Sequence, residues 1–337
     1  RYGNQTQKIF NMNNIIKSQI KNKNLLRPFS VDSHPRNNLS IWLDKNENLD
    51  PYLQKIINRV KSKVPSISLS TYPEASELYR KLSKWLRVSK KNIILTHGSD
   101  GAIKATFELF ISPGDKVIHM DPTFAMYPVY AKIFGANTKK IVYTKKENKP
   151  YISLEKILYT IDLEKPKLFC LANPDSPTGN VFNKTDLKKI ILLCKKNNTI
   201  VLIDEAYHPF SKITAVNLIK EFDNLVIART FSKAWGLAGL RVGYLVSSEK
   251  IINFFNKIRP MYEVSTYSIA FIEKMMSYKN EMYNSVKRLK NGKLFFEKEM
   301  IKLGFKVINC DSNFLHVDFN SYKEYESIVE YYEGHFE

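Results

Sequence analysis

From residue 92 onward, short apolar runs alternate with segments in which apolar residues recur at helical spacing. The strand-like runs cover 92–96, 116–120, 167–173, 199–207 and 224–232. The helical spacing covers 102–110, 125–135 and 184–198, where we expect Thr185 or Asp186 to cap the helix. Apolar strands that alternate with helices predict a parallel sheet covered on both faces.

The two ends of the chain have a different pattern. Residues 1–40 are polar and rich in Asn and Lys, which indicates an arm with some helix. After residue 250 long helices are expected over 251–258 and 268–304, followed by a strand-like segment at 314–319. We therefore expect an arm (1–45), a large α/β domain (46–250) and a smaller α+β domain (251–337), the last incomplete within this sequence.

The composition is that of an ordinary globular protein, with 44% hydrophobic and 25% charged residues in 337. The net charge of +19 would allow nucleic-acid binding. The lysines are scattered, however, and no basic and aromatic module is visible, so we expect no nucleic-acid partner. We interpret the charge as a surface rich in Lys and Asn, and secondarily as a preference for a small anionic substrate.

The cysteines and the hydropathy bear on location. Cys170 and Cys194 lie within apolar runs, far apart in the sequence and from Cys310, which indicates reduced thiols in a cytoplasmic protein. No apolar run is long enough to span a bilayer, so no membrane association is expected. No metal site is expected either.

Polar residues follow the predicted strands, and in a parallel sheet such residues gather at one edge. Ser99, Asp100 and Gly101 begin a helix after the first strand, where backbone N–H groups and the helix dipole bind anions. An N-cap with a tight turn would give the same local sequence. Phe124 follows the next strand, and a rigid turn at 173–179 contains Ser176. Each of these features alone is compatible with a structural role.

The last two strands end in charged residues. Asp204 at the end of a buried strand needs a partner, either a helix cap or lysine, or a protonated ring nitrogen. Lys233 follows the next strand in a mostly buried setting, which lowers the pKa of an amine and makes it nucleophilic. Arg241, eight residues later, is suited to bind a phosphate through parallel hydrogen bonds.

The ordered set resembles a known family. The segments NPDSPTG (173–179), IDEAY (203–207) and TFSKAWGLAGLRVGY (230–244) resemble fold-type I pyridoxal-phosphate enzymes. Within them, the chain is most similar to class I/II aminotransferases of the histidinol-phosphate aminotransferase branch, from about residue 43 to residue 319. The resemblance implies a mostly parallel mixed sheet sandwiched by helices, a smaller α+β domain, and pyridoxal 5'-phosphate as cofactor.

The resemblance also implies residue roles. Lys233 corresponds to the Schiff-base lysine, which also moves the proton, and Asp204 to the partner of the pyridine nitrogen. Tyr207 corresponds to the donor to the phenolic oxygen of the ring, and Phe124 to the aromatic residue that stacks on it. Tyr72 would reach the cofactor phosphate of a neighbouring subunit, which implies a homodimer. The cofactor phosphate would be bound by Ser99, Asp100, Gly101, Thr230, Ser232 and Arg241.

The chain departs from the family pattern at two places. Ser176 stands where the family has an Asn that bonds the phenolic oxygen, so its shorter hydroxyl would reach that oxygen only through water, or the substrate side of the site differs. The family also has an arginine for the substrate carboxylate near the C-terminus, and no arginine follows residue 314 here. Either the sequence ends early, or the carboxylate is bound otherwise, or the substrate lacks one.

These observations favour an aminotransferase that moves an amino group between an amino acid donor and a small phosphorylated or phosphonated keto or aldehyde acceptor. Lys45, Tyr52 and Arg259 are candidates for binding the substrate anion, from their positions in the resemblance. A decarboxylase of a phosphorylated amino acid would use the same scaffold and cofactor residues. A nucleic-acid-binding protein without catalysis is the alternative of another class, favoured by charge alone.

Overall fold

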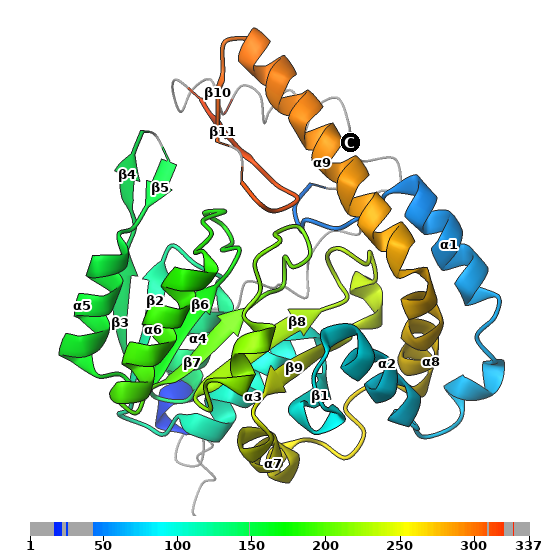
Figure 1. Cartoon of the computed structure of the whole chain (residues 1–337), viewed down its shortest axis with the longest axis horizontal. Helices are drawn as coiled ribbons and strands as arrows, with labels where there is room; N and C mark the ends of the chain where they lie inside the picture. Colours follow the sequence, from blue (N-terminus) through cyan, green and yellow to red (C-terminus); the bar gives the residue numbers. More distant parts are fainter. Residues whose placement is uncertain are drawn as a thin grey trace, which may run out of the picture.

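The computed structural model of the chain describes residues 17–21, 25, 43–147, 149–308, 310–319 and 326. Its centre is a seven-stranded sheet (Figure 1). Strand β9 pairs antiparallel with both of its neighbours, and the other pairings in the sheet are parallel. The expected mostly parallel mixed sheet is thereby confirmed. In spatial order the strands are β1 (Ile93–Thr96), β9 (Gly243–Ser247), β8 (Leu225–Thr230), β7 (Ile200–Asp204), β6 (Leu168–Ala172), β2 (Lys116–Asp121) and β3 (Asn137–Val142).

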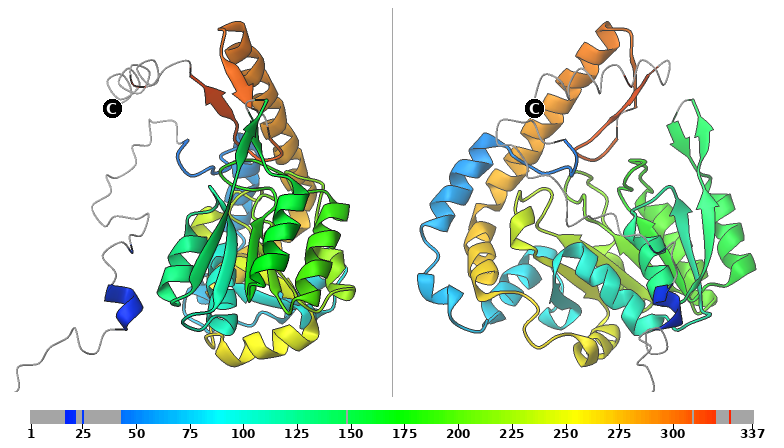
Figure 2. Two further views of the ribbon diagram at one scale, coloured as in Figure 1. Left: turned by 90° about the vertical axis from the view of Figure 1, so that its left-hand side faces the viewer. Right: turned by 180° about the vertical axis from the view of Figure 1, so that it is seen from behind.

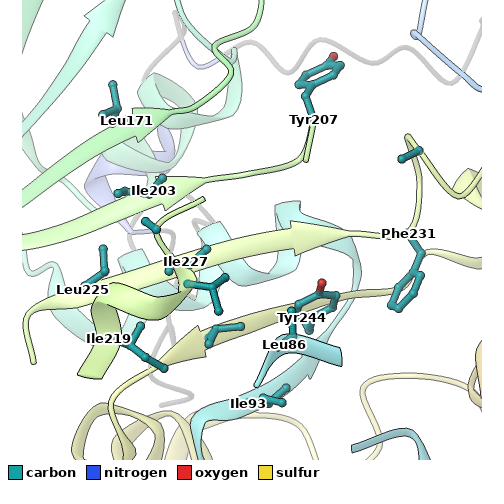
Figure 3. Close-up of a cluster of buried hydrophobic side chains, with 14 of the residues drawn as sticks. Leu86, Ile93, Leu171, Ile203, Tyr207, Ile219, Leu225, Ile227, Phe231 and Tyr244 are labelled. Carbon is teal, nitrogen blue, oxygen red and sulfur yellow. The ribbon is translucent and has the colours of Figure 1, made fainter. Parts of the chain in front are cut away.

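Successive residues of a strand point to opposite faces of the sheet. Both faces of this sheet carry buried apolar residues, and helices cover each of them. Within β7, Val201 and Ile203 join one buried cluster while Leu202 joins the other. Figure 3 shows part of the first cluster, including Ile203 and Ile227. The helices α2 (Ser76–Leu86), α5 (Leu154–Glu164) and α6 (Lys184–Lys196) contribute to the first cluster. The second receives α3 (Gly98–Phe110), α4 (Met126–Ile133) and α7 (Glu249–Ile258).

Helix α1 (Pro51–Lys61) packs against two helices from the other end of the chain, α8 (Thr266–Met275) and α9 (Lys279–Lys302). Asp50 caps α1 by accepting a hydrogen bond from the Leu53 N–H, and it pairs with Arg288 of α9 at 2.6 Å. Strands β10 (Lys306–Ile308) and β11 (His316–Asp318) form an antiparallel ribbon next to α9. Figures 1 and 2 show α1, α9 and this ribbon grouped beside the sheet.

Several local expectations needed correction. The cap of α6 is Asn183, which has extended backbone angles and accepts from the Asp186 N–H at 3.0 Å, so the helix begins before Thr185. The helical stretch expected over 268–304 is divided between α8 and α9 by the 3₁₀ turn η7 (Met276–Tyr278). A small hairpin, β4 (Thr144–Lys146) and β5 (Lys149–Tyr151), was not expected.

The division into domains stays a prediction. Most of the expected arm, 1–45, lies outside the described residues, apart from the short turn η2 (Ser18–Lys21) and a few neighbours. Cys170 and Cys194 are buried thiols. Across the described ranges, none of the helices is long and apolar enough to cross a membrane. The same ranges contain no group of three or more His, Cys, Asp or Glu residues that would hold a metal ion.

Candidate active site

One cavity of about 540 Å³ contains most of the predicted site residues. It lies where the parallel strands β6, β7 and β8 end, because their carboxyl ends share one edge of the sheet. The segment 44–47 completes the wall from a distant part of the sequence. The predicted residues that line the cavity are Lys45, Ser99, Asp100, Phe124, Ser176, Asp204, Tyr207, Thr230, Ser232, Lys233 and Arg241.

The phosphate-binding part of the cavity is built around the start of α3. This helix has no side-chain cap, so its first backbone N–H groups are available to an anion. Gly98 has φ +71°, and a Cβ added there would lie 3.0 Å from the Arg241 guanidinium. Glycine at this position therefore lets Arg241 approach the helix start. The Ser232 hydroxyl lies 3.4 Å from Arg241 Nη1 and 2.9 Å from Thr230 Oγ1.

Asp100 and Gly101 are placed differently from Ser99. The Asp100 carboxylate accepts a hydrogen bond from Tyr130 Oη at 2.9 Å, so its side chain is already occupied by a neutral donor. The Gly101 N–H donates to the His97 carbonyl at 3.2 Å as part of α3. Gly101 also lines a separate cavity rather than this one. The geometry therefore favours Ser99 and Asp100 over Gly101 as phosphate-binding positions.

Asp204 is a buried carboxyl whose described hydrogen-bond donors are neutral. The Ala206 N–H donates to Oδ1 at 2.9 Å, and Tyr127 Oη donates to Oδ2 at 3.4 Å. Burial raises the pKa of Asp204 to about 7, and these two hydrogen bonds oppose the rise. A carboxyl in this setting would become fully ionised on pairing with a cationic group such as a protonated ring nitrogen.

Lys233 is the cavity's candidate nucleophile. Its amine donates a hydrogen bond to the Lys45 carbonyl at 2.6 Å and lies 5.7 Å from the centre of the Tyr207 ring. Burial lowers the pKa of Lys233, while the charges of Glu47 and Asp204 raise it to a smaller extent. A lowered pKa increases the fraction of neutral, nucleophilic amine near neutral pH.

The phenol of Tyr207 lies between two polar side chains. Asn46 Nδ2 donates to Tyr207 Oη at 3.0 Å, and the phenol donates to Ser176 Oγ at 3.5 Å. Phe124 is half-buried and contacts Tyr127 edge-to-face, with ring centres 5.8 Å apart. The Tyr207 and Phe124 rings thus belong to the same cavity as Lys233.

Three candidates lie away from this cavity. Tyr72 is 77% exposed and stacks on Tyr262 with ring centres 4.5 Å apart. Tyr52 lies on α1 beside Arg288, and Arg259 lines the neighbouring cavities. Within one chain, Tyr52 and Arg259 therefore do not line the cavity that contains Lys45. An exposed Tyr72 is compatible with contact to another chain.

The sequence interpretation assigned no role to Asn46 or Tyr127. Tyr127 lies in the first turn of α4, whereas Phe124 precedes that helix, so the sequence pattern marks Tyr127 only as a member of the expected helix. Asn46 contacts Tyr207 from 161 positions away in the sequence, a relationship that no local pattern contains.

The side chains fit pyridoxal phosphate. Free helix N–H groups, two hydroxyls and an arginine suit its phosphate, and the buried Asp204 carboxyl suits a protonated ring nitrogen. The half-buried amine of Lys233, with its lowered pKa, suits the aldehyde. The family carboxylate-binding arginine has no counterpart in the described segment 310–319. The last arginine of the sequence, Arg288, pairs with Asp50 and Glu281 instead.

Comparisons with known proteins agree with pyridoxal phosphate as the cofactor. The family model for class I and II aminotransferases matches residues 40–331. Two curated relatives named histidinol-phosphate aminotransferase come from Ruminiclostridium cellulolyticum (33% identical, 92% of this chain and 85% of the relative) and Thermoanaerobacter pseudethanolicus (34%, 91% and 84%). The same fold occurs in the crystal structure of histidinol-phosphate aminotransferase from Sinorhizobium meliloti in complex with pyridoxal-5'-phosphate, with a TM-score of 0.75. The two chains are 22% identical, and the match covers 86% of this chain and 79% of the other.

Proposed function

The chain belongs to the class I and II aminotransferases, and from this premise we propose that it transfers an amino group between an amino acid and a small phosphorylated carbonyl compound. We propose histidinol phosphate as the amine form of that compound, because the similar curated relatives carry that substrate in their names. The enzyme is a pyridoxal-phosphate-dependent aminotransferase with a small-molecule donor and acceptor.

The observation that carries the assignment of residues is the convergence of Lys233, Asp204 and Arg241 on one cavity. When bound, pyridoxal phosphate supplies an aldehyde that reacts with amines and a ring that accepts an electron pair from the substrate carbon. Asp204 would hold the ring nitrogen in its protonated form. Ser99 and Asp100, through the backbone at the start of α3, would bind the phosphate together with Thr230, Ser232 and Arg241. Phe124 would cover one face of the ring.

Lys233 would carry out the proton movement. Its amine is held in the cavity by the Lys45 carbonyl, and its lowered pKa allows it to accept a proton from the substrate carbon. The same amine would then deliver that proton to a carbon of the cofactor. Tyr207 would donate a hydrogen bond to the phenolic oxygen of the ring, with Ser176 close to the same phenol.

Lys45 is the proposed contact for the substrate phosphate. It lines the same cavity as Lys233 and has an exposed side chain paired with Asp44 at 3.5 Å. An ammonium group in that position offers a second cation, separate from Arg241, to an anionic substrate. Tyr52 and Arg259 lie elsewhere in the described chain, so the structure gives them less support.

We also propose a homodimer in which Tyr72 reaches the cofactor phosphate of the neighbouring subunit. Tyr72 is exposed and stacked on Tyr262, and Met261 beside it is 80% exposed. Exposed aromatic and apolar side chains grouped in this way are typical of protein interfaces.

The test is a substrate panel with purified holoenzyme and 2-oxoglutarate. Histidinol phosphate should give the highest kcat/KM for glutamate formation, ahead of histidinol, histidine, alanine and phenylalanine. Inorganic phosphate should compete with histidinol phosphate without releasing the cofactor. Carbon dioxide is measured in parallel with a phosphorylated amino acid, because its release would support the decarboxylase instead. Fastest turnover of plain aromatic amino acids would remove the phosphorylated substrate.

A further inference from the structure

We propose that Asn46 is a positioning residue for the phenol of Tyr207, and that it compensates for the short side chain at Ser176. The proposal rests on the proposed contact of Tyr207 with the cofactor. It begins from a difference in distance, because Asn46 Nδ2 lies 3.0 Å from Tyr207 Oη and Ser176 Oγ lies 3.5 Å from it. The amide therefore makes the closer contact to the phenol.

The direction of the Asn46 hydrogen bond leaves the phenol's own hydrogen available. An amide nitrogen only donates, so Tyr207 Oη is the acceptor in this contact. The phenol hydrogen points toward Ser176 over 3.5 Å, the long limit of a hydrogen bond. A better acceptor placed near Tyr207 would take that hydrogen. Burial raises the pKa of Tyr207, which keeps the phenol protonated and therefore a donor.

Two connected hydrogen bonds strengthen one another. When Asn46 donates to the Tyr207 oxygen, the O–H bond becomes more polarised and donates more strongly to the next acceptor. The proposed acceptor is the phenolic oxygen of the cofactor ring. Asn46 would thus influence the ring through Tyr207 without touching it.

The backbone around Asn46 fixes the position of the amide. Asn46 has φ +53°, a left-handed conformation that Asn adopts more readily than most residues. Its carbonyl accepts a hydrogen bond from Asn313 Nδ2 at 2.9 Å, and the preceding carbonyl, of Lys45, accepts one from Lys233. Asn313 and Lys233 therefore hold two successive carbonyl groups of the turn, those of Asn46 and Lys45.

The choice of variant follows from this backbone. Asn46→Gly removes the amide and tolerates positive φ, whereas Asn46→Ala would add backbone strain. Asn46→Asp keeps the size but presents acceptors, which would draw the phenol hydrogen away from the ring. Asn313→Ala is the matched control, because it removes another amide that contacts the same turn but not the phenol.

The readouts are the dissociation constant of pyridoxal phosphate from the apoprotein and the pH titration of the visible absorption of the holoenzyme. Asn46→Gly should raise the dissociation constant by about 2- to 10-fold, the range expected for one hydrogen bond, and shift the titration. Asn46→Asp should have a larger effect than Asn46→Gly. In a Tyr207→Phe background, Asn46→Gly should add nothing, and Ser176→Asn should partly rescue Asn46→Gly.

The outcomes separate this proposal from the role of Tyr207. If Tyr207→Phe changes both readouts but Asn46→Gly changes neither, Asn46 does not position the phenol. If Tyr207→Phe also leaves both readouts unchanged, the proposed contact of Tyr207 with the cofactor is wrong as well. An effect of Asn313→Ala equal to that of Asn46→Gly would assign the result to the turn rather than to the amide.

Discussion

The amine of Lys233 lies 2.6 Å from the backbone carbonyl oxygen of Lys45, although 188 positions separate the two residues in the sequence. This contact brings the segment 44–47 into the cavity formed by the strand ends. Lys45 thus offers its backbone carbonyl to Lys233, while the side chain of Lys45 is exposed beside the same cavity. The proposed catalytic amine and the proposed substrate contact are neighbours for this reason.

Lys45→Ala should weaken binding of the phosphorylated substrate. Loss of one ammonium contact to phosphate is expected to raise KM for histidinol phosphate roughly 10-fold, with a small effect on kcat. The dissociation constant of pyridoxal phosphate should not change. Lys55→Ala on the exposed side of α1 is the control. An unchanged KM in Lys45→Ala would place the substrate phosphate elsewhere.

Asp204→Asn should keep the fold but reduce turnover. A neutral amide cannot hold the ring nitrogen protonated, so the barrier should rise on the order of several kcal/mol. The measurement is kcat of the cofactor-loaded variant, with circular dichroism as the check on folding. Near-normal turnover would make Asp204 a structural residue.

Asp204 should also make the stability of the cofactor-free protein depend on pH. Burial raises its pKa from 3.8 to about 7, so between these values the folded state binds more protons than the unfolded state. The favourable contribution is therefore complete below pH 3.8 and is lost as the pH rises through about 7. Its size is on the order of 4 kcal/mol for a fully buried group.

The check is Tm of apoprotein as a function of pH. Wild type should lose stability relative to Asp204→Asn as the pH rises from about 4 to about 8, a window that covers most of the range between the two pKa values. Added pyridoxal phosphate should reduce the difference. Parallel Tm curves for the two apoproteins would show that the Asp204 pKa is ordinary.

A shared site predicts complementation between inactive variants. Lys233→Ala and Tyr72→Ala homodimers should each have low activity, whereas a hybrid dimer would contain one site with both residues intact. Random mixing should restore up to about a quarter of wild-type activity. Absence of recovery, with hybrid formation shown by mass spectrometry, would contradict the role of Tyr72 across the interface.

Much of the cavity was predictable because its residues follow successive strands. Asp204 ends β7, and Thr230 ends β8 shortly before Lys233, so the apolar runs alone place them at one edge of the sheet. The identity of the cofactor needed more, since the resemblance to a family gave the roles that spacing did not. The roles themselves remain predictions for the experiments above.

Other features depended on tertiary contacts. Strand β9 follows β8 after the loop that contains Lys233 and Arg241. It lies between β8 and β1 and runs antiparallel to both. Helix α1 is stabilised by packing on α8 and α9 and by the ion pair of Asp50 with Arg288. Neither relationship leaves a local pattern in the sequence.

The most direct test of the account is to identify the lysine that bonds pyridoxal phosphate. The holoenzyme is reduced with borohydride, digested, and the modified peptide is sequenced by mass spectrometry, with Lys220→Ala as a surface control. The account predicts that the modification is on Lys233 and that Lys233→Ala gives no reduced adduct and no turnover. A reduced adduct on another lysine, or full turnover of Lys233→Ala, would contradict it.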